Sequence, residues 1–358
     1  MMKHKLLITI LLLLLLIAAM AVFLLISVFM LYNGTFLPQS SALITGNVVD
    51  NDYNNLLAGG NLVRIGDKLY FNYHKNNYVY GLVEISSKGS QRIYWDGPKW
   101  FGYYIYNHPI SRYNGELLMM LEYQVQVYSP DSGAFLAYEP MSALSERHLR
   151  FQAYNDSVIY LDEEGTSSLC ISDADAAEVL VDENVVAFYV SGDGLYYYQA
   201  ENTATPGEFR KNNILDGTDV SMFRLEDISG VYYLMVEGDY LIFDGYQPLS
   251  TDENNYSVYK IDLQHPDQGI KLVYTGGSDY SAGTYDIRCW NVYDGTVYVA
   301  LPGGLKSVDL STGEEMWHCD ISAEECYIVD DLWVYVVDAD GHLWRVSQSG
   351  GTTEKVFG

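Results

Sequence analysis

Residues 294–317, DGTVYVALPGGLKSVDLSTGEEMW, decide the fold class of this chain. An Asp-Gly turn opens a strand rich in Val and Tyr, a Pro-Gly-Gly turn follows, and a second strand ends at Asp309. A Ser-Thr-Gly turn then leads into a short strand that reaches Trp317. β-Branched and aromatic runs separated by Gly, Asn and Asp turns predict antiparallel hairpins rather than helices.

The same pattern recurs, in less regular form, from residue 63 to residue 357. Tyr298 and Tyr335 occupy equivalent positions, and the same offset places Cys289 on Cys326. Seven four-stranded units at a period of roughly 40 to 50 residues predict an all-β, seven-bladed β-propeller with antiparallel blades. One small sheet cannot bury both faces alone, whereas a closed ring of sheets removes the exposed edges. Six or eight blades remain alternatives, if the fourth unit is divided differently or residues 43–58 add a strand.

The N-terminus predicts a membrane anchor. Residues 6–31 carry no charge, and a helix of that length spans about 39 Å, more than the roughly 30 Å of a bilayer core. The apolar region of a cleaved signal is shorter, about 7–15 residues. Lys3 and Lys5 place residues 1–5 in the cytoplasm by the positive-inside rule. We therefore expect a single-pass cell-membrane protein with a stalk at 32–45 and an extracytoplasmic propeller at 46–358.

The exported part is strongly acidic. Without Lys3 and Lys5 it holds 18 basic and 47 acidic side chains, a formal charge of −29. Such a field disfavours nucleic acid and anionic lipid surfaces as partners. Solubility explains much of this charge, and a cationic partner or loosely bound divalent ions are the functional alternatives.

The cysteines indicate neither a disulfide framework nor a metal site. Their positions, Cys170, Cys289, Cys319 and Cys326, form no CxxC or CxxCH motif. Cys319 and Cys326 bracket a short connection, so their pairing in an oxidising compartment is an open question. Two polar insertions, residues 199–221 and 244–257, are expected to project as loops.

The opening segment resembles the repeat of quinoprotein-like propellers. That group includes pyrroloquinoline-quinone alcohol dehydrogenases and a cofactor-free lipoprotein of the outer-membrane assembly machinery. The resemblance implies that Thr312, Gly313 and Trp317 form a latch that seals one blade against the next. The chain has no adjacent Cys-Cys pair, which the quinone enzymes carry at their cofactor, so no cofactor is expected.

A second resemblance covers nearly the whole exported region. Residues 46–77, GNVVDNDYNNLLAGGNLVRIGDKLYFNYHKNN, and 80–89, YGLVEISSKG, resemble uncharacterised bacterial membrane-anchored propellers. Those proteins are related to the low-density-lipoprotein-receptor type of propeller. This resemblance implies a fold and an anchor, and it implies no activity, ligand or catalytic residue.

Motifs for catalysis and metal binding are absent or incomplete. Residues 129–136, SPDSGAFL, approximate a sialidase Asp-box but end in Leu. Residues 338–349, DADGHLWRVSQS, begin like a calcium loop but have Ser349 where the bidentate Glu should stand. There is no HExxH, no Gly-x-Ser-x-Gly elbow and no phosphate-binding glycine loop. No catalytic, cofactor-binding or metal-ligating residue is therefore predicted.

The aromatic connection at residues 95–109, WDGPKWFGYYIYNHP, is the strongest recognition feature. Stacking on sugars or burial against a protein partner suits such a segment, and the alternative is a plug over one end of the propeller. The proposed binding patch consists of Trp100, Phe101, Tyr103 and Tyr104.

A non-catalytic scaffold or sensor for a protein, peptide or cell-envelope polymer is the expected function. The alternative is a carbohydrate-active enzyme, a glycoside hydrolase or lyase, acting through acids at the mouth of the central channel. An enzyme should gather two or more carboxylates and a basic side chain there. A binding module should instead show an apolar or aromatic patch on one face.

Overall fold

The structure is a computed structural model, in which every blade is built from consecutive strands. The residues that it describes are 13–25, 27, 40–49, 60–75, 79–96, 110–121, 124–138, 150–162, 167–172, 177–181, 184–201, 205–247, 255–276, 278–279, 284–285 and 287–358.

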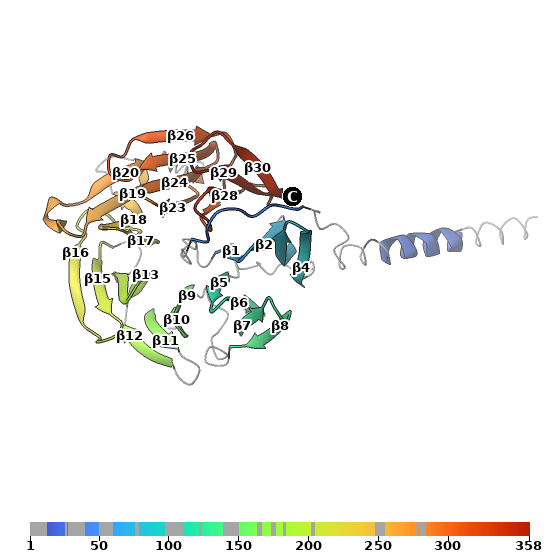
Figure 1. Ribbon diagram of the computed structural model, residues 1–358, viewed down its shortest axis with the longest axis horizontal. Coiled ribbons are helices and arrows are strands. Elements are labelled where there is room, and N and C mark those ends of the chain that lie inside the picture. Colours follow the sequence, from blue (N-terminus) through green and yellow to red (C-terminus); the bar gives the residue numbers. More distant parts are fainter. Residues whose placement is uncertain are drawn as a thin grey trace, which may run out of the picture.

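Seven four-stranded antiparallel sheets form a ring (Figure 1). Blade 1 contains β1 (Leu62–Ile65), β2 (Lys68–Lys75), β3 (Val79–Ser86) and β4 (Gly89–Asp96). Blade 2 contains β5 (Ile110–Tyr113), β6 (Glu116–Leu121), β7 (Gln124–Ser129) and β8 (Ala134–Ala137). Blade 3 contains β9 (Arg150–Tyr154), β10 (Ser157–Asp162), β11 (Ser168–Ser172) and β12 (Ala177–Val181). Blade 4 contains β13 (Val185–Ser191), β14 (Gly194–Gln199), β15 (Glu208–Asn213) and β16 (Asp219–Arg224).

The second half of the ring follows the same order. Blade 5 contains β17 (Leu234–Glu237), β18 (Tyr240–Gln247), β19 (Asn255–Asp262) and β20 (Lys271–Thr275), with the short 3-10 helix η2 (Pro266–Gln268) before β20. Blade 6 contains β23 (Cys289–Tyr293), β24 (Thr296–Leu301), β25 (Gly304–Asp309) and β26 (Glu315–Cys319). Blade 7 contains β27 (Glu325–Tyr327), β28 (Trp333–Val337), β29 (Leu343–Ser347) and β30 (Thr353–Phe357). The two-stranded sheet β21 (Ser278–Asp279) and β22 (Thr284–Tyr285) lies between blades 5 and 6 in the sequence. The predicted seven-bladed propeller is confirmed.

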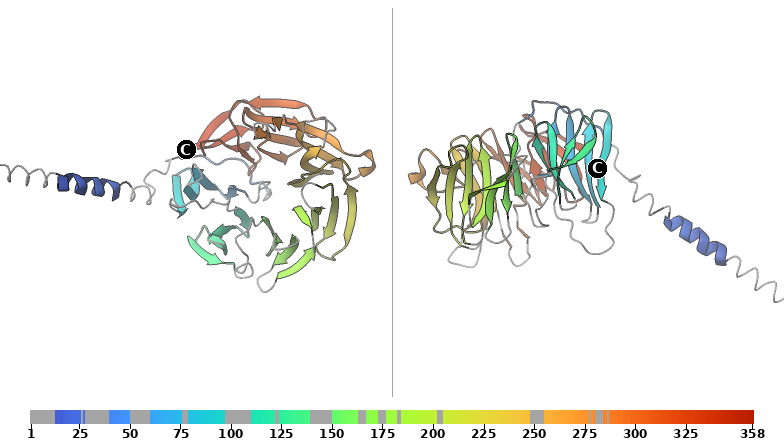
Figure 2. Two further views of the ribbon diagram at one scale, coloured as in Figure 1. Left: turned by 180° about the vertical axis from the view of Figure 1, so that it is seen from behind. Right: turned by 90° about the horizontal axis from the view of Figure 1, so that it is seen from below.

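The first strand of each blade lies toward the centre of the ring and the fourth toward its rim (Figures 1 and 2). Buried apolar side chains gather between neighbouring blades instead of within single sheets. One cluster joins Leu62 and Phe71 of blade 1 to Tyr335 and Phe357 of blade 7, and another spans blades 4 to 6. Stability therefore depends on closing the ring, since each sheet buries its faces against its neighbours.

Residues 40–49 form an N-terminal strap between blades 1 and 7. Ala42 and Ile44 are buried in the cluster that these two blades share. The Ala42 amide donates to the Ser86 carbonyl of blade 1 at 3.1 Å, and the Val49 amide donates to the Val329 carbonyl of blade 7 at 3.3 Å. The predicted boundary between stalk and propeller at residue 45 falls inside this packed segment. Residue 48 forms an isolated bridge with Asp330, so residues 43–49 add no further strand.

Strands occupy part of both segments that were expected to form loops. Residues 199–221 contain the whole of β15 and the start of β16, and β18 and β19 extend into residues 244–257. The run EFRKNN pairs with the Tyr-rich β14, and its one apolar residue, Phe209, is buried against Tyr198 and Phe243. Residues 208–213 are therefore a strand where a loop was expected, because cross-strand pairing outweighs local polarity. Residues 202–204 and 248–254 lie outside the described residues, so projecting hairpin loops stay a prediction there.

Residues 13–25 are helical. Ten apolar side chains of this helix are 54–72% exposed. No helix among the described residues is both long and apolar enough to cross a membrane. The remaining residues of the predicted 6–31 span, apart from Ser27, lie outside the described part of the chain.

Candidate functional site

One face of the ring carries the short hairpin turns. In an antiparallel blade, the turn between the first and second strands and the turn between the third and fourth strands point to the same side. We call this side the turn face. The turn between the first and second strands of every blade lies on the turn face.

Every first turn of the ring carries a carboxylate in the turn or directly after it. Positive backbone φ values at Asn114, Asn155 and Asp294, and at Gly66, Gly192 and Gly238, identify these segments as tight turns. The first-turn carboxylates of blades 1 to 7 are Asp67, Glu116, Asp156, Asp193, Asp239, Asp294 and Asp331. The repeat thus distributes negative charge around the whole turn face.

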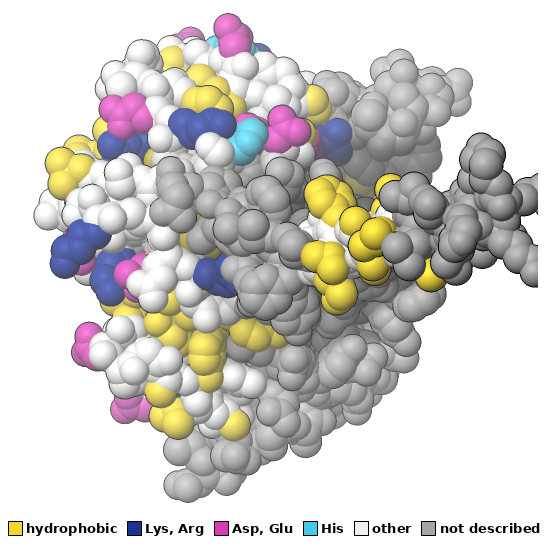
Figure 3. Space-filling view, turned by 90° about the vertical axis from the view of Figure 1, so that its right-hand side faces the viewer, with side chains coloured by type: hydrophobic (Ala, Val, Ile, Leu, Met, Phe, Trp, Pro, Cys, Tyr) yellow, Lys and Arg dark blue, Asp and Glu magenta, His cyan; other side chains and the backbone are white. Residues whose placement is uncertain are grey.

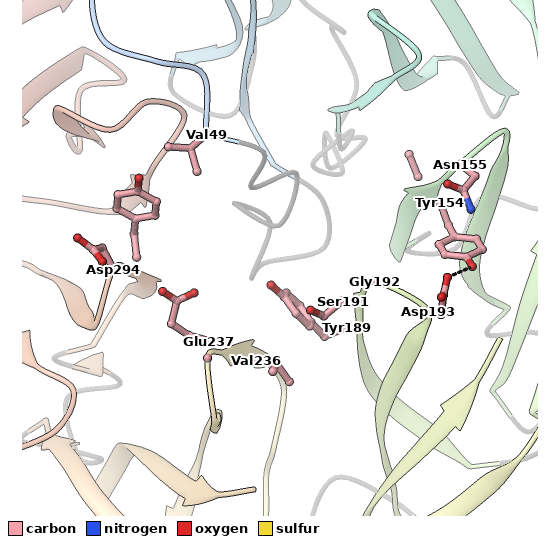
Figure 4. A pocket seen from close by; sticks show the side chains of 13 residues that line it. Val49, Tyr154, Asn155, Tyr189, Ser191, Gly192, Asp193, Val236, Glu237 and Asp294 are labelled. Carbon is pink, nitrogen blue, oxygen red and sulfur yellow. Dashed lines mark hydrogen bonds between the residues drawn. The ribbon is translucent and has the colours of Figure 1, made fainter. Parts of the chain in front are cut away.

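A cavity of about 680 Å³ opens where four of these turns and the strap converge (Figure 4). The first turns of blades 3 to 6 supply most of its wall, and Val49 of the strap completes it. Asp193, Glu237 and Asp294 are its carboxylates, and Tyr154, Tyr189 and Tyr293 are its aromatic residues. Sequence reasoning missed this site, although carboxylates in or next to the first turns, such as Asp193 and Asp294, signalled it.

The cavity carboxylates differ in their partners. The Tyr154 hydroxyl of blade 3 donates to Asp193 Oδ1 of blade 4 at 2.9 Å, which fixes that carboxylate. No described residue forms a hydrogen bond or ion pair with the side chains of Glu237 and Asp294, which come from blades 5 and 6. These two therefore offer free acceptor oxygens to a ligand.

No described residue that lines the cavity is Lys, Arg or His. Elsewhere charges of both signs are interspersed, as on the side of the molecule shown in Figure 3. A propeller enzyme was expected to combine two or more carboxylates with a basic side chain. The described lining of the cavity has the carboxylates but no basic side chain. Its tyrosines meet the criterion for a binding module only in part, because the site is polar rather than apolar.

Tyr293 is a neutral hydrogen-bond donor in the cavity. Burial raises the pKa of its phenol, and the charges of Asp331, Asp294 and Glu237 raise it further. Ionisation beside these carboxylates would add a further negative charge, so the hydroxyl stays protonated at physiological pH. It can therefore donate a hydrogen bond, and its ring can face a cation.

A second network is buried between blades 5 and 6. Asp244 is fully buried and accepts from the amides of Tyr232 and Tyr233 at 2.9 and 3.0 Å. Its other oxygen accepts from the Tyr256 hydroxyl at 2.5 Å and from Trp290 Nε1 at 3.0 Å. Burial raises the pKa of Asp244 to about 6, although these four donors act in the opposite direction. We interpret this network as structural, because no part of the carboxylate reaches solvent.

The predicted latch residues divide into two contacts. Thr312 and Gly313 form the turn between β25 and β26, where Asp309 Oδ1 accepts from the Thr312 amide and hydroxyl at 2.7 and 3.0 Å. Lys260 of blade 5 donates to the carbonyls of Leu310 and Ser311 in the same turn, the latter at 2.8 Å.

Trp317 faces the other way, toward blade 7. Its Nε1 donates to the Gln348 carbonyl at 2.9 Å, and a Cβ on Gly350 would lie only 3.0 Å from the indole Cγ. Gly350 also has a φ of 76°. Blade 6 is therefore held to blade 5 by its turn and to blade 7 by its Trp. The strength of the latch stays a prediction.

Asp338, Asp340 and His342 have ligand atoms within 4.8 Å of one another. Asp338 Oδ1 accepts from the amides of Asp340 and His342, both at 2.9 Å. Its Oδ2 accepts from Trp344 Nε1 at 2.8 Å and lies 2.9 Å from His342 Nδ1. These internal bonds occupy Asp338, so the segment is a hairpin turn, as the sequence indicated.

The predicted patch of Trp100, Phe101, Tyr103 and Tyr104 lies outside the described residues. Whether Cys319 pairs with Cys326 was left open by the sequence, and the structure does not place the two sulfurs together. None of the four cysteines forms a disulfide. The Cys326 sulfur lies 3.9 Å from that of Cys289, while the Cys319 sulfur lies 3.6 Å from Thr353 Oγ1. The two neighbours occupy equivalent positions on the inner strands β23 and β27, whereas Cys319 ends the outer strand β26.

No protein-family model and no curated protein matches this chain. Among solved structures, a puromycin-hydrolyzing peptidase of Mycobacterium tuberculosis is similar at a TM-score of 0.56 and 13% identity, over 90% of this chain and 56% of that chain. A structure of S. cerevisiae Dbp5 bound to Nup159 and Gle1 contains a similar chain, at a TM-score of 0.50, 12% identity and coverages of 86% and 92%. The N-terminal domain of Nup159 gives a TM-score of 0.49 at 13% identity, with coverages of 86% and 93%.

The likenesses at TM-scores of 0.56 and 0.50 support the fold alone. The chain spans little more than half of the peptidase chain, so that enzyme's activity does not transfer with the architecture. The narrower resemblances, to quinoprotein-like propellers and to membrane-anchored bacterial propellers, stay predictions.

Proposed function

We propose that this protein is a non-catalytic, membrane-anchored β-propeller that binds a protein or peptide partner through the cavity on its turn face. The partner presents a basic side chain, Lys or Arg. The observation that carries the proposal is the uncompensated charge of Glu237 and Asp294 inside a cavity that also holds Asp193.

Electrostatics favours a cationic ligand over the alternatives. At a separation of 4 Å and an effective dielectric constant of 20, a pair of opposite charges attracts by roughly 4 kcal/mol before desolvation costs. An anionic ligand would be repelled by the same carboxylates with an energy of similar size. The acidic turn face also raises the association rate of a basic partner.

The size of the cavity suits part of a chain rather than a whole domain. A volume of about 680 Å³ lies within the range of small-ligand pockets, roughly 300–1,000 Å³. One or two long side chains fill such a space, and Tyr154, Tyr189 and Tyr293 offer rings for their aliphatic or cationic parts. We therefore expect a short basic segment as the bound element.

Anchoring through residues 6–31 remains part of the proposal. The apolar helix at 13–25 supports it. Moving each large apolar side chain from water into the membrane is favourable by about 1.5–3 kcal/mol. Lys3 and Lys5 would stay in the cytoplasm, and the propeller would lie outside. A membrane-bound full-length chain with a protease-accessible propeller in intact cells would support this topology.

A carbohydrate-active enzyme is the second candidate, favoured by carboxylates on neighbouring blades. Its test is release of reducing ends from a panel of cell-envelope polysaccharides by the full-length chain. Product formation that Glu237→Gln abolishes would favour the enzyme over the binding scaffold.

Selection from a library of random nine-residue peptides tests the binding proposal. The full-length chain should enrich peptides with Lys or Arg and deplete those with Asp or Glu. A variant with Asp193→Asn, Glu237→Gln and Asp294→Asn should lose this enrichment. Peptides enriched equally by both proteins would contradict the proposed site.

A further inference from the structure

Two buried thiols meet between the inner strands of blades 6 and 7. Cys289 on β23 and Cys326 on β27 are 6% and 0% exposed. Their sulfur atoms lie 3.9 Å apart, and both cysteines are free. The other cysteines lie elsewhere, Cys319 against Thr353 and Cys170 in the cluster between blades 2 and 3.

We propose that Cys289 and Cys326 are a disulfide-forming pair that links blade 6 to blade 7 when the chain folds in the presence of a disulfide oxidant. The repeat explains the geometry, because both residues occupy the same position in consecutive blades, 37 residues apart. A disulfide bond is about 2.05 Å long, so the two sulfurs must approach by a little under 2 Å. Inner strands of adjacent blades already lie side by side, so side-chain rotation and a small strand shift supply this movement.

The reaction is a thiol–disulfide exchange with a small disulfide such as oxidised glutathione. One cysteine thiolate attacks the oxidant, forms a mixed disulfide and displaces one glutathione thiolate. The second cysteine thiolate then attacks the protein sulfur of that mixed disulfide and displaces the other. The two protons released by the cysteines end on the two reduced glutathione molecules.

Burial sets the timing of this step. In the folded ring, burial and the neighbouring Cys289 and Glu325 raise the pKa of the Cys326 thiol, so its reactive thiolate is suppressed. The bond therefore forms while blades 6 and 7 are still closing, and the packed ring shields it afterwards. In a reducing compartment the same pair stays as two thiols that pack as small apolar groups.

Peptide mapping identifies the bond in the wild-type chain. Full-length protein is unfolded, reduced and refolded with either oxidised and reduced glutathione or dithiothreitol, and free thiols are then alkylated. Trypsin leaves Cys289 in residues 289–306 and both Cys319 and Cys326 in residues 307–345. A second cleavage at Asp320 or Glu324 separates Cys319 from Cys326 and so identifies which of them is bonded to Cys289. We expect one cross-linked species, joining Cys289 to Cys326, only in the glutathione sample.

Thermal unfolding gives an independent readout. The oxidised protein should melt on the order of 5 °C higher than the reduced protein, because the bond restricts the unfolded chain. A double variant, Cys170→Ala with Cys319→Ser, should keep both the cross-link and the rise in Tm, whereas Cys289→Ala should abolish both. A bond between Cys319 and Cys326, or full alkylation of Cys289 after oxidative refolding, would overturn the proposal.

Discussion

At the scale of single residues, the ring depends on side chains that reach from one blade to the next. Trp317 bonds to blade 7, Lys260 bonds to the turn of blade 6, and Trp290 of blade 6 bonds to Asp244 of blade 5. Each contact combines burial with a satisfied polar atom, so its removal leaves both a void and an orphaned partner.

Trp317→Ala should lower the free energy of unfolding by about 3–5 kcal/mol, because it removes a large packed side chain and its bond to Gln348. Urea denaturation measures this loss. Met316→Ala is the matched control, since Met316 is 48% exposed on the same strand and should cost less than about 1 kcal/mol. Similar losses for both variants would show that Trp317 is not docked.

Asp244 should make stability depend on pH in the acid range. The folded state holds its proton with a pKa of about 6, against an ordinary value of 3.8, so the folded state binds more protons between these limits. Its contribution is fully present below about pH 4 and is lost as the pH rises through 6, by about 3 kcal/mol.

The Asp244→Asn variant isolates this effect. As the pH rises from 4 to 7, the unfolding free energy of wild-type protein should decline relative to that of Asp244→Asn. Asp267→Asn, an exposed site, should run parallel to wild type. A constant difference between wild type and Asp244→Asn across this range would contradict the assignment.

At the scale of elements, the N-terminal strap closes the ring without strand exchange. Blades 1 and 7 are each complete from contiguous sequence, so the strap's backbone bonds and side-chain contacts join them. Arg64 is buried and donates to the carbonyls of Thr45 and Gly46 at 3.0 and 2.9 Å, and it lies 3.5 Å from Asp330 of blade 7. One guanidinium thus ties together the strap and both terminal blades.

Arg64→Met should destabilise the fold by about 3–5 kcal/mol, because Asp330 is left buried without its counter-charge. Lys68→Met removes a charge that pairs with Glu84 near the surface, and should cost less than about 1 kcal/mol. Urea midpoints of the two variants provide the comparison. Equal costs would mean that the strap does not depend on Arg64.

The turns were the most predictable part of the site. Gly66-Asp67, Gly192-Asp193 and Asp294-Gly295 read as tight turns in the sequence, and counting repeats placed them in equivalent positions. Their convergence on one cavity follows from ring closure, which residue spacing does not reveal. Contacts between residues far apart in the sequence, such as Arg64 with Asp330, could not be predicted either, because they also depend on ring closure.

The errors have equally local causes. EFRKNN at residues 208–213 lacks the apolar alternation of a strand, yet β14 recruits it through backbone pairing. The sequence left a pairing of Cys319 with Cys326 open because the two residues are close in sequence, whereas neighbouring blades bring together residues one repeat apart.

At the scale of the whole molecule, part of the formal charge of −27 is concentrated on the turn face. The repeat places a carboxylate in or directly after every first turn, and the turns of blades 3 to 6 line the cavity. Binding there should weaken as salt screens exposed charges, since the Debye length falls from about 10 Å at 0.1 M to about 3 Å at 1 M.

The central claim is that this cavity, rather than the general negative charge, binds basic segments. Fluorescence anisotropy with a labelled peptide of arginines spaced by glycines gives Kd for two full-length variants of equal net charge. The cavity variant, Asp193→Asn with Glu237→Gln and Asp294→Asn, should bind at least about tenfold more weakly than wild type, a loss of about 1.4 kcal/mol. The control variant, Glu178→Gln with Glu201→Gln and Asp340→Asn, changes exposed acids outside the cavity and should bind like wild type. Equal weakening in both variants would contradict the account.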